Sequence, residues 1–235
     1  MSEDYEEDEI IELIHYSGNY GGITQDSKFW DDYEDMGEEE LLKHKIIKIK
    51  IYSGTFQKKQ VIFGINYTFQ NLFTGEILRS KDHRGSEDFN DVREFNIKDD
   101  EYLTEFHIRF PSDAEYISQL GFGTNKKRMI LIGTEDGEDR NISSNGKDNV
   151  IIGTFGCIDK KLDAFGCLYI SKKEYLKRFL FSFFMLRHLF KKDQNFKKEW
   201  DKKYKALPQD YQYLWKTVNI SDDKLFSQII KFCYL

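Results

Sequence analysis

The stretch IIGTFGCIDKKLDAFGCLYI, residues 151–170, decides the fold class of this chain. Isoleucine, phenylalanine, leucine and tyrosine recur on both sides of the charged segment 159–161, and glycines interrupt each apolar run. Short runs rich in β-branched and aromatic residues, bounded by polar turn residues, are typical of β-strands. The stretch therefore predicts two strands separated by a turn.

The same pattern extends outward through most of the chain, from about His15 to Ile170. Apolar and polar residues alternate in short runs that end at Gly, Asn, Asp or Ser, and such alternation places every second side chain on one face of a sheet. No segment of helical period separates these runs, so a βαβ fold is excluded. The sequence predicts a mainly β sandwich, barrel or prism. The clearest runs are IIKIKIYSG (46–54), QVIFGINYTF (60–69), EFHIRF (105–110) and RMILIG (128–133).

Composition indicates a folded protein that functions inside the cell. Its 235 residues are 16% aromatic and include only two prolines, which is enough apolar content to form a core. The start, MSEDYEEDEIIE, is acidic and resembles neither a signal peptide nor a transit peptide. Three cysteines without C-x-x-C spacing are expected to be buried thiols. We expect a cytoplasmic location, including cytoskeletal or ciliary assemblies, and no secretion.

Charge is distributed unevenly along the chain. Residues 1–40 hold fifteen acidic residues and one lysine, whereas residues 171–235 hold fifteen basic and seven acidic residues. The intervening residues 41–170 are neutral, with nineteen of each sign. Either the two ends contact each other, or each faces a partner of opposite charge, or both are solvated. Nucleic acid is an unlikely partner, because no nucleic-acid motif accompanies the basic end.

The sequence pattern changes from strand-like to helix-like at Ser171, where SKKE (171–174) is typical of a helix-capping box. The following run, YLKRFLFSFFMLRHLF (175–190), is apolar on nearly every face, so we expect it to be buried against the β region or another subunit. It is too short and too charged to span a membrane. Two further helices are expected before residue 235. The residues predicted to dock a protein partner are Phe179, Phe183, Phe184, Leu186 and Phe190.

The sequence contains no recognisable catalytic or metal-binding motif. Its five histidines are scattered, and no serine lies in a nucleophile elbow. The acidic run SEDFNDVRE (86–94) lacks the spacing of a calcium loop. Glycines 121 and 123 do not open a helix, so they do not form a phosphate cradle. We therefore predict a protein that is not an enzyme and that needs no cofactor or metal.

Four landmarks, in order, make the β region similar to the jacalin-related lectins. NYGG (19–22) with FWDD (29–32) resembles an early aromatic-glycine segment, and EYISQLGFGTNKKR (115–128) resembles paired strands that end in T-N-K-x-R. GTEDG (133–137) resembles the family's G-T-E-x-G turn, and residues 151–170 resemble its terminal hairpin. The resemblance implies a β-prism of three four-stranded sheets over residues 15–170, between an acidic leader (1–14) and a helical extension (171–235).

The resemblance also implies a sugar-binding site. In this family an aspartate at the end of a G-x-x-x-D loop accepts hydrogen bonds from sugar hydroxyls, as an ionised carboxylate can. Asp163 matches that aspartate, and the backbone of Lys161 and Leu162 would face the sugar. Two positions depart from the pattern. Asp159 replaces the loop glycine, which predicts a strained or changed backbone, and Ser27 replaces an N-terminal glycine, so its side chain could fill the sugar's space.

Two functions from different classes follow from these observations. The first is a structural or scaffold subunit of a larger protein assembly, in which the prism is a rigid core with a degenerate sugar site and the C-terminal region docks protein subunits. The second is an intracellular lectin of the mannose/glucose type, which binds a hexose-containing glycan through Asp163. Asp163 also has a purely structural interpretation, as an aspartate that caps a tight turn before a strand.

Overall fold

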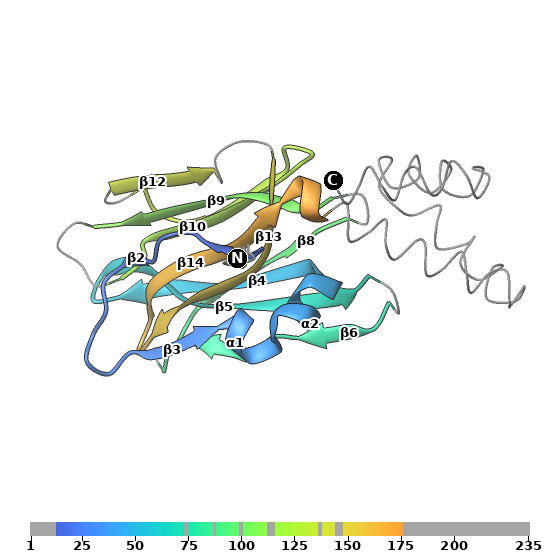
Figure 1. Cartoon of the computed structure of the whole chain (residues 1–235). Helices are drawn as coiled ribbons and strands as arrows, with labels where there is room; N and C mark the ends of the chain where they lie inside the picture. The colour runs from blue at the N-terminus through green and yellow to red at the C-terminus, as the bar shows by residue number, and fades with distance from the viewer. Residues whose placement is uncertain are drawn as a thin grey trace, which may run out of the picture.

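The fold was analysed in a computed structural model of the chain (Figure 1). The structure describes residues 13–72, 75–86, 88–98, 101–111, 116–135, 138–143 and 148–175. These residues form a mainly β structure in which three sheets surround a common apolar interior. In Figure 1 the long strands of all three sheets run roughly along one axis.

Each sheet contains a path of four hydrogen-bonded strands. The first sheet has the order β1-β14-β13-β3, the second β11-β10-β9-β12 and the third β6-β5-β4-β8. Two further short strands join the edges of this pattern, β2 on β14 and β7 on β5. The strands are β1 His15–Tyr16, β2 Tyr20–Gly21, β3 Lys28–Asp31, β4 His44–Phe56, β5 Lys59–Asn71, β6 Ile77–Arg79, β7 His83–Arg84, β8 Asp91–Asn96, β9 Leu103–Phe110, β10 Gln119–Thr124, β11 Met129–Gly133, β12 Glu138–Ser143, β13 Asn149–Ile158 and β14 Leu162–Ser171.

The predicted count of four strands per sheet needs a correction. Because of the two short strands, the sheets contain five, four and five strands. Both additions are two-residue segments of connecting chain that lie antiparallel to a longer strand for two residue pairs, as Gly21 does opposite Ala164. The prediction of a mainly β fold with three sheets is confirmed. The stretch 151–170 forms β13 and β14, which pair antiparallel along their length.

Alternation of side chains builds the core. Ile49 and Ile51 of β4 point inward and are fully buried, whereas Lys48 and Lys50, which alternate with them, point outward and pair with Glu94 of β8. The same inward face on each sheet contributes to one cluster of buried residues, which includes Phe106, Phe122 and Phe165. Burial of aromatic side chains of this size is the largest favourable contribution to such a core.

Two short helices between β3 and β4 were not predicted. They are α1 (Asp32–Met36) and α2 (Glu38–Lys43), and both begin with acidic residues in the first turn. The Tyr33 N–H donates to the Asp31 carboxylate at 2.8 Å, which caps α1, and acidic residues near a helix N-terminus are stabilised by its dipole. Helices of five and six residues are too short to show a helical period in the sequence.

The predicted change of structure at Ser171 begins where expected. The Glu174 N–H donates to the Ser171 hydroxyl at 3.1 Å, and residues 172–175 form the first turn of a helix. Tyr175 is buried beside Tyr102, with 6.0 Å between the ring centroids. The remainder of the predicted helical extension, including the five predicted docking residues, lies outside the described residues. Among the described residues, no helix is long and apolar enough to cross a membrane.

Candidate functional site

Three chain segments meet around Asp163, at the start of β14. The N-terminal segment arrives through Gly22, whose N–H donates to the Asp163 carbonyl at 3.2 Å. The segment after β7 arrives through Ser86, whose N–H donates to the Asp159 carbonyl at 3.1 Å. The third segment is the turn 159–161 between β13 and β14. The structure therefore brings together the predicted residues Ser27, Asp159, Lys161, Leu162 and Asp163.

The Asp163 carboxylate is fully buried, and the protein itself occupies both of its oxygens. The Ser27 hydroxyl donates to Oδ2 at 2.8 Å, and the Lys161 ammonium donates to Oδ1 at 3.0 Å. The exposed fraction of the Asp163 side chain is 0% and that of Lys161 is 13%. A buried charge is stable only with such partners. Each carboxylate oxygen thus has a donor from the same chain.

Ser27 is itself fixed by a compact loop. The Thr24 N–H donates to the Ser27 hydroxyl oxygen at 3.0 Å, and the Thr24 hydroxyl lies 2.8 Å from the same oxygen. Because this oxygen receives the Thr24 N–H, the Ser27 hydroxyl hydrogen is available for Asp163. The insertion ITQDS thus folds into a turn that directs one hydroxyl at the carboxylate.

Lys161 contributes through its side chain as well as through its backbone. Its ammonium lies 6.0 Å from the ring centroid of Phe56, and an aromatic face at this distance attracts a cation. From the sequence we expected only the Lys161 backbone to face a ligand. The sequence does not show in which direction the flexible Lys161 side chain folds. Its contact with Asp163, two residues further along the chain, was therefore not predicted.

The backbone of the turn is held by hydrogen bonds on several sides. The Asp159 N–H donates to the Lys161 carbonyl at 3.2 Å, and the Ile117 N–H donates to the carbonyl of Leu162 at 3.1 Å. Leu162 is fully buried in the core. Of the two outcomes predicted at Asp159, a strained or a changed backbone, positive-φ strain is not present. Asp159 is not among the described non-glycine residues with positive φ, so it adopts this turn without the conformation that favours glycine.

Glycines permit the close approach of the other two segments. Gly21 has φ +119°, and a Cβ at this position would collide with the Asp163 carbonyl oxygen. A Cβ on Gly85 would collide with the peptide that joins Lys160 to Lys161. Only glycine allows backbones to pack this closely. Sequence reasoning recognised Gly21 as a landmark but missed Gly85, which the segment HRGSEDF gave no pattern to identify.

Cys157 lies beside this cluster on β13. Burial, followed by the nearby negative charge of Asp163, raises the pKa of the Cys157 thiol from 9.0 to about 11. Its sulfur lies 3.9 Å from the carbonyl oxygen of Gly22. The expectation of buried thiols is confirmed for Cys157 and Cys167, which are both free and buried, while Cys233 lies outside the described residues. A thiol with a raised pKa is a poor nucleophile.

The polar groups of this cluster are paired with one another. Asp163 is paired with a cation, from Lys161, and with a hydroxyl, from Ser27. Among the residues that the structure describes, no three His, Cys, Asp or Glu side chains group as a metal site would require.

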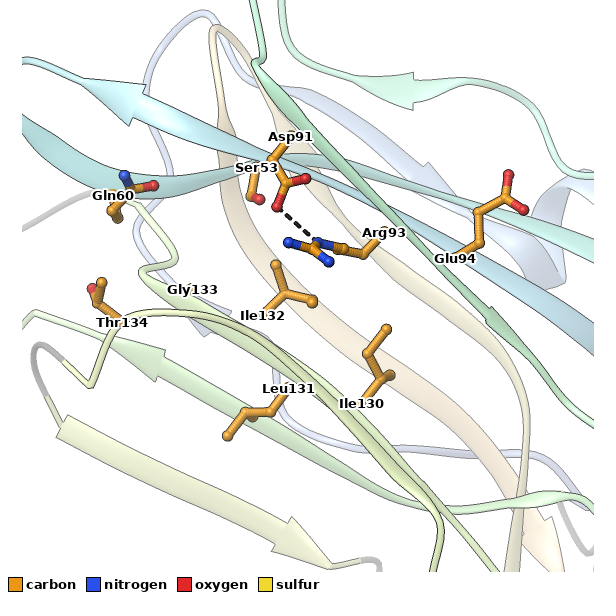
Figure 2. A pocket seen from close by; sticks show the side chains of 10 residues that line it. All are labelled: Ser53, Gln60, Asp91, Arg93, Glu94, Ile130, Leu131, Ile132, Gly133 and Thr134. Carbon is orange, nitrogen blue, oxygen red and sulfur yellow. Dashed lines mark hydrogen bonds and ion pairs between the residues drawn. The ribbon is translucent and has the colours of Figure 1, made fainter.

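A second feature lies between two other sheets. A groove of about 610 Å³ separates β8, at the edge of one sheet, from β11, at the edge of another (Figure 2). Asp91 and Arg93 of β8 form an ion pair at 3.0 Å on one wall, and Ile130 and Ile132 of β11 point toward it from the other. Sequence reasoning identified β11 as a strand but did not identify this groove.

Comparison with known proteins gives a family and a fold. The family model for the jacalin-like lectin domain matches residues 17–168. A mannose-binding jacalin-related lectin from Ananas comosus is 16% identical with a TM-score of 0.53, and covers 68% of this chain and 99% of its own. For Calystegia sepium agglutinin the values are 20%, 0.50, 69% and 99%. For artocarpin in complex with mannotriose they are 19%, 0.52, 67% and 98%.

A search among curated protein sequences gives no match. The solved structures share the fold at low identity, so they support the three-sheet architecture described above and not a particular ligand. The family model, in contrast, spans well over half of the sequence and includes both the N-terminal segment and the Asp163 turn. The chain belongs to the jacalin-like lectin family.

Proposed function

We propose that this protein is a non-enzymatic jacalin-like domain with a closed sugar site, which serves as a structural subunit of a protein assembly. The observation that carries the proposal is the Asp163 carboxylate, which is fully buried with Ser27 on one oxygen and Lys161 on the other. A carboxylate that recognises a hexose must offer its oxygens to the sugar's hydroxyls. In this chain those oxygens already have internal donors.

The magnitudes favour the closed state over sugar binding. A monosaccharide with a dissociation constant of about 1 mM gains about 4 kcal/mol on binding. Separating a buried carboxylate from its cation costs about 3–5 kcal/mol, which is comparable with that binding free energy. Opening the pair between Asp163 and Lys161 would therefore offset most or all of the binding free energy of a simple hexose.

The scaffold role is supported by the sequence of the C-terminal region. Residues 171–235 have an excess of eight positive charges and contain the apolar run with the predicted docking residues Phe179, Phe183, Phe184, Leu186 and Phe190. An apolar run in the sequence together with a charge imbalance suits docking to a protein partner. We include in the proposal an intracellular, cytoplasmic location.

Two experiments test the proposal. Calorimetric titration of the full chain with methyl α-mannoside, followed by a glycan array, should detect no specific binding. Affinity capture with the full chain should recover partner proteins that a chain ending at Ser171 does not recover. Specific hexose binding that Asp163→Asn abolishes would contradict the closed site. Equal recovery by both chains would contradict the docking role of residues 172–235.

A second candidate is an intracellular lectin for a hexose-containing glycan. It is favoured by the position of Asp163, which the fold holds at the start of β14 beside the Gly21–Gly22 segment. It is also favoured by the ligands of the structural relatives, one of which is mannose-binding and another of which is complexed with mannotriose. In this reading the sugar replaces Ser27 and Lys161 on the carboxylate. The titration above separates the two candidates.

A further inference from the structure

The outer face of the sheet β6-β5-β4-β8 carries an excess of positive charge. In an antiparallel sheet, residues that lie opposite one another on neighbouring strands share a face. Two neighbouring outward rows, which we call the basic face, hold three cations and one carboxylate between them. From β6 to β8, the first row consists of Arg79, Thr68, Lys48 and Asn96, and the second of Asn66, Lys50 and Glu94.

Glu94 is the carboxylate of the basic face, and two lysines share it. The Lys48 ammonium lies 3.2 Å from its Oε2 atom, and the Lys50 ammonium lies 2.9 Å from its Oε1 atom. Glu94 raises the pKa of the Lys50 ammonium, and the nearby positive charge of Arg79 opposes this rise. One negative charge therefore faces three positive charges, and the basic face keeps an excess of two.

The three cations are accessible from the outer side of the sheet. Arg79 is exposed on the short edge strand β6, and no carboxylate among the described residues forms an ion pair with it. The side chains of Lys48 and Lys50 are 38% and 36% exposed. A guanidinium presents five donors and can bind a carboxylate through two of them. The basic face can therefore accept further carboxylates.

Residues 1–12 of this chain have the opposite charge, and the chain that follows them begins beside the basic face. They precede the described part of the chain and contain seven acidic residues and no lysine or arginine. Ile14 packs in the same buried cluster as Leu41 and Leu42 of α2. Helix α2 leads directly into β4 at His44. The acidic segment 1–12 is therefore attached at the end of the molecule where β4 enters its sheet.

The length of the acidic segment is sufficient to reach the basic face. Twelve residues can span up to about 40 Å at about 3.3 Å per residue, whereas the path along β4 from His44 to Lys50 is about 20 Å. The acidic residues at positions 4, 6 and 8 alternate with others. In an extended chain such residues share one side at a spacing of about 7 Å, which is also the spacing of Lys48 and Lys50 along β4.

We propose that the basic face is the docking surface for residues 1–12 of the same chain, whose carboxylates pair with Lys48, Lys50 and Arg79. A short tether raises the effective concentration of a segment to the millimolar range, so an intrinsic dissociation constant of about 1 mM is enough to populate this contact. An anionic partner must then displace the segment before it can bind the face. The contact is independent of the Asp163 site, which lies on the β13–β14 sheet.

A competing occupant for the acidic segment is the basic region 171–235, which has an excess of eight positive charges. This region also leaves from the same end of the molecule, because Tyr175 and Ile14 belong to one buried cluster. The basic face is the better match, since its three cations are already held on neighbouring strands and need not be brought together on binding. Cross-linking distinguishes the two occupants.

The first test is zero-length carbodiimide cross-linking of the full chain, followed by peptide mass spectrometry. Carboxylates of residues 3–9 should form amide bonds with Lys48 or Lys50, at a yield that does not depend on protein concentration. The yield should fall at least about fivefold between 0.01 and 1 M salt, because the Debye length falls from about 30 to about 3 Å. The internal control is the bond between Lys50 and Glu94, which are 2.9 Å apart. Cross-links from residues 3–9 only to lysines of residues 172–235, or none to the basic face while the control bond forms, overturn the proposal.

Charge reversal on the basic face is the second test. In the full chain, Arg79→Glu should lower the yield of cross-links from residues 3–9 to Lys48 and Lys50 at least about fivefold, because a carboxylate then repels the acidic segment. Arg79 is exposed, so the variant should keep the wild-type circular dichroism. The matched control is Lys28→Glu, which makes the same charge change at an exposed position of β3 in another sheet and should leave the yield unchanged. A selective loss in Arg79→Glu supports the proposal. An unchanged yield in Arg79→Glu, or equal losses in both variants, overturns it.

Discussion

The Asp163 turn and the β11 edge differ in how their polar groups are satisfied. At the turn, the carboxylate is fully buried and receives a hydroxyl and an ammonium from the same chain. At the edge, the outward backbone groups of β11 face away from their sheet, and no described strand pairs with them. The carboxylate is therefore paired within the chain, whereas the outer edge of β11 is not paired with any described strand.

This difference teaches where a ligand or partner can gain free energy. A partner that approaches Asp163 must first break hydrogen bonds that the protein has already made. A strand that approaches β11 only exchanges water for backbone partners and covers Met129 and Leu131. The same fold thus combines a buried, fully paired carboxylate with an exposed strand edge.

The largest expected loss of stability comes from adding a Cβ at Gly21, where the backbone packs against Asp163. Gly21→Ala should lower the free energy of unfolding by about 4 kcal/mol, because it combines a strained backbone with a collision at the Asp163 carbonyl. The control is Gly37→Ala, which also has positive φ but meets no atom within 4 Å, and which should cost about 1–3 kcal/mol. Urea unfolding measures both. Equal losses would show that the close contact with Asp163 is not significant.

The next effect tests the ion pair at the turn. Asp163→Ala should destabilise the fold by about 3 kcal/mol, because it leaves the Lys161 ammonium, which is 13% exposed, without its partner. Adding Lys161→Met should recover part of this loss, so that a double-mutant cycle gives a coupling of about 2 kcal/mol. A coupling near zero would indicate that the pair is open in solution and that the site is accessible.

The third effect is a dependence of stability on pH. The folded-state pKa of the Cys157 thiol, about 11, lies above its ordinary value of 9.0, mainly because of burial. The protonated thiol thus contributes stability below pH 9, and this contribution is lost as the pH rises from 9 to 11. We expect a loss of about 1–2 kcal/mol over this interval. Cys157→Ala should reduce the slope, as measured by urea unfolding at each pH, and an unchanged slope would argue against a buried neutral thiol.

The smallest effect on stability is expected at the open edge. Leu131→Glu should change the free energy of unfolding of the monomer by no more than about 0.5 kcal/mol, since its side chain is half exposed and contributes little to the core. The contrast with Asp163→Ala distinguishes an exposed strand edge from a buried ion pair. Urea unfolding of the wild type and the variant at low protein concentration measures this change in the free energy of unfolding. A loss as large as that at Asp163 would place Leu131 in the core.

The β structure was predictable because its signal is periodic. Ile49 and Ile51 alternate with Lys48 and Lys50 in the sequence, and the structure places them on opposite faces of β4. The helices α1 and α2 were missed, because five or six residues do not complete two turns and their formation depends on local caps such as Asp31. The free edge of β11 was also missed, because pairing order is a property of the folded sheet.

The residues of the sugar-site position were predictable, but their contacts were not. Order in the sequence placed Asp163 in the turn and Ser27 near it, and the structure puts their oxygens 2.8 Å apart. The ammonium of Lys161 on Oδ1 depends on how one flexible side chain folds, which no sequence pattern encodes. The sequence left a strained or a changed backbone open at Asp159, and the structure shows no positive φ at that residue. Whether these residues bind a sugar stays a prediction.

The most direct test of the closed site is a calorimetric titration of methyl α-mannoside into two proteins, the wild type and Ser27→Gly/Lys161→Ala. The double variant removes both internal donors from Asp163 and keeps the carboxylate. We predict measurable binding by the variant and none by the wild type. Binding by the wild type with the same affinity as the variant would contradict closure, because Ser27 and Lys161 would then present no barrier to the sugar.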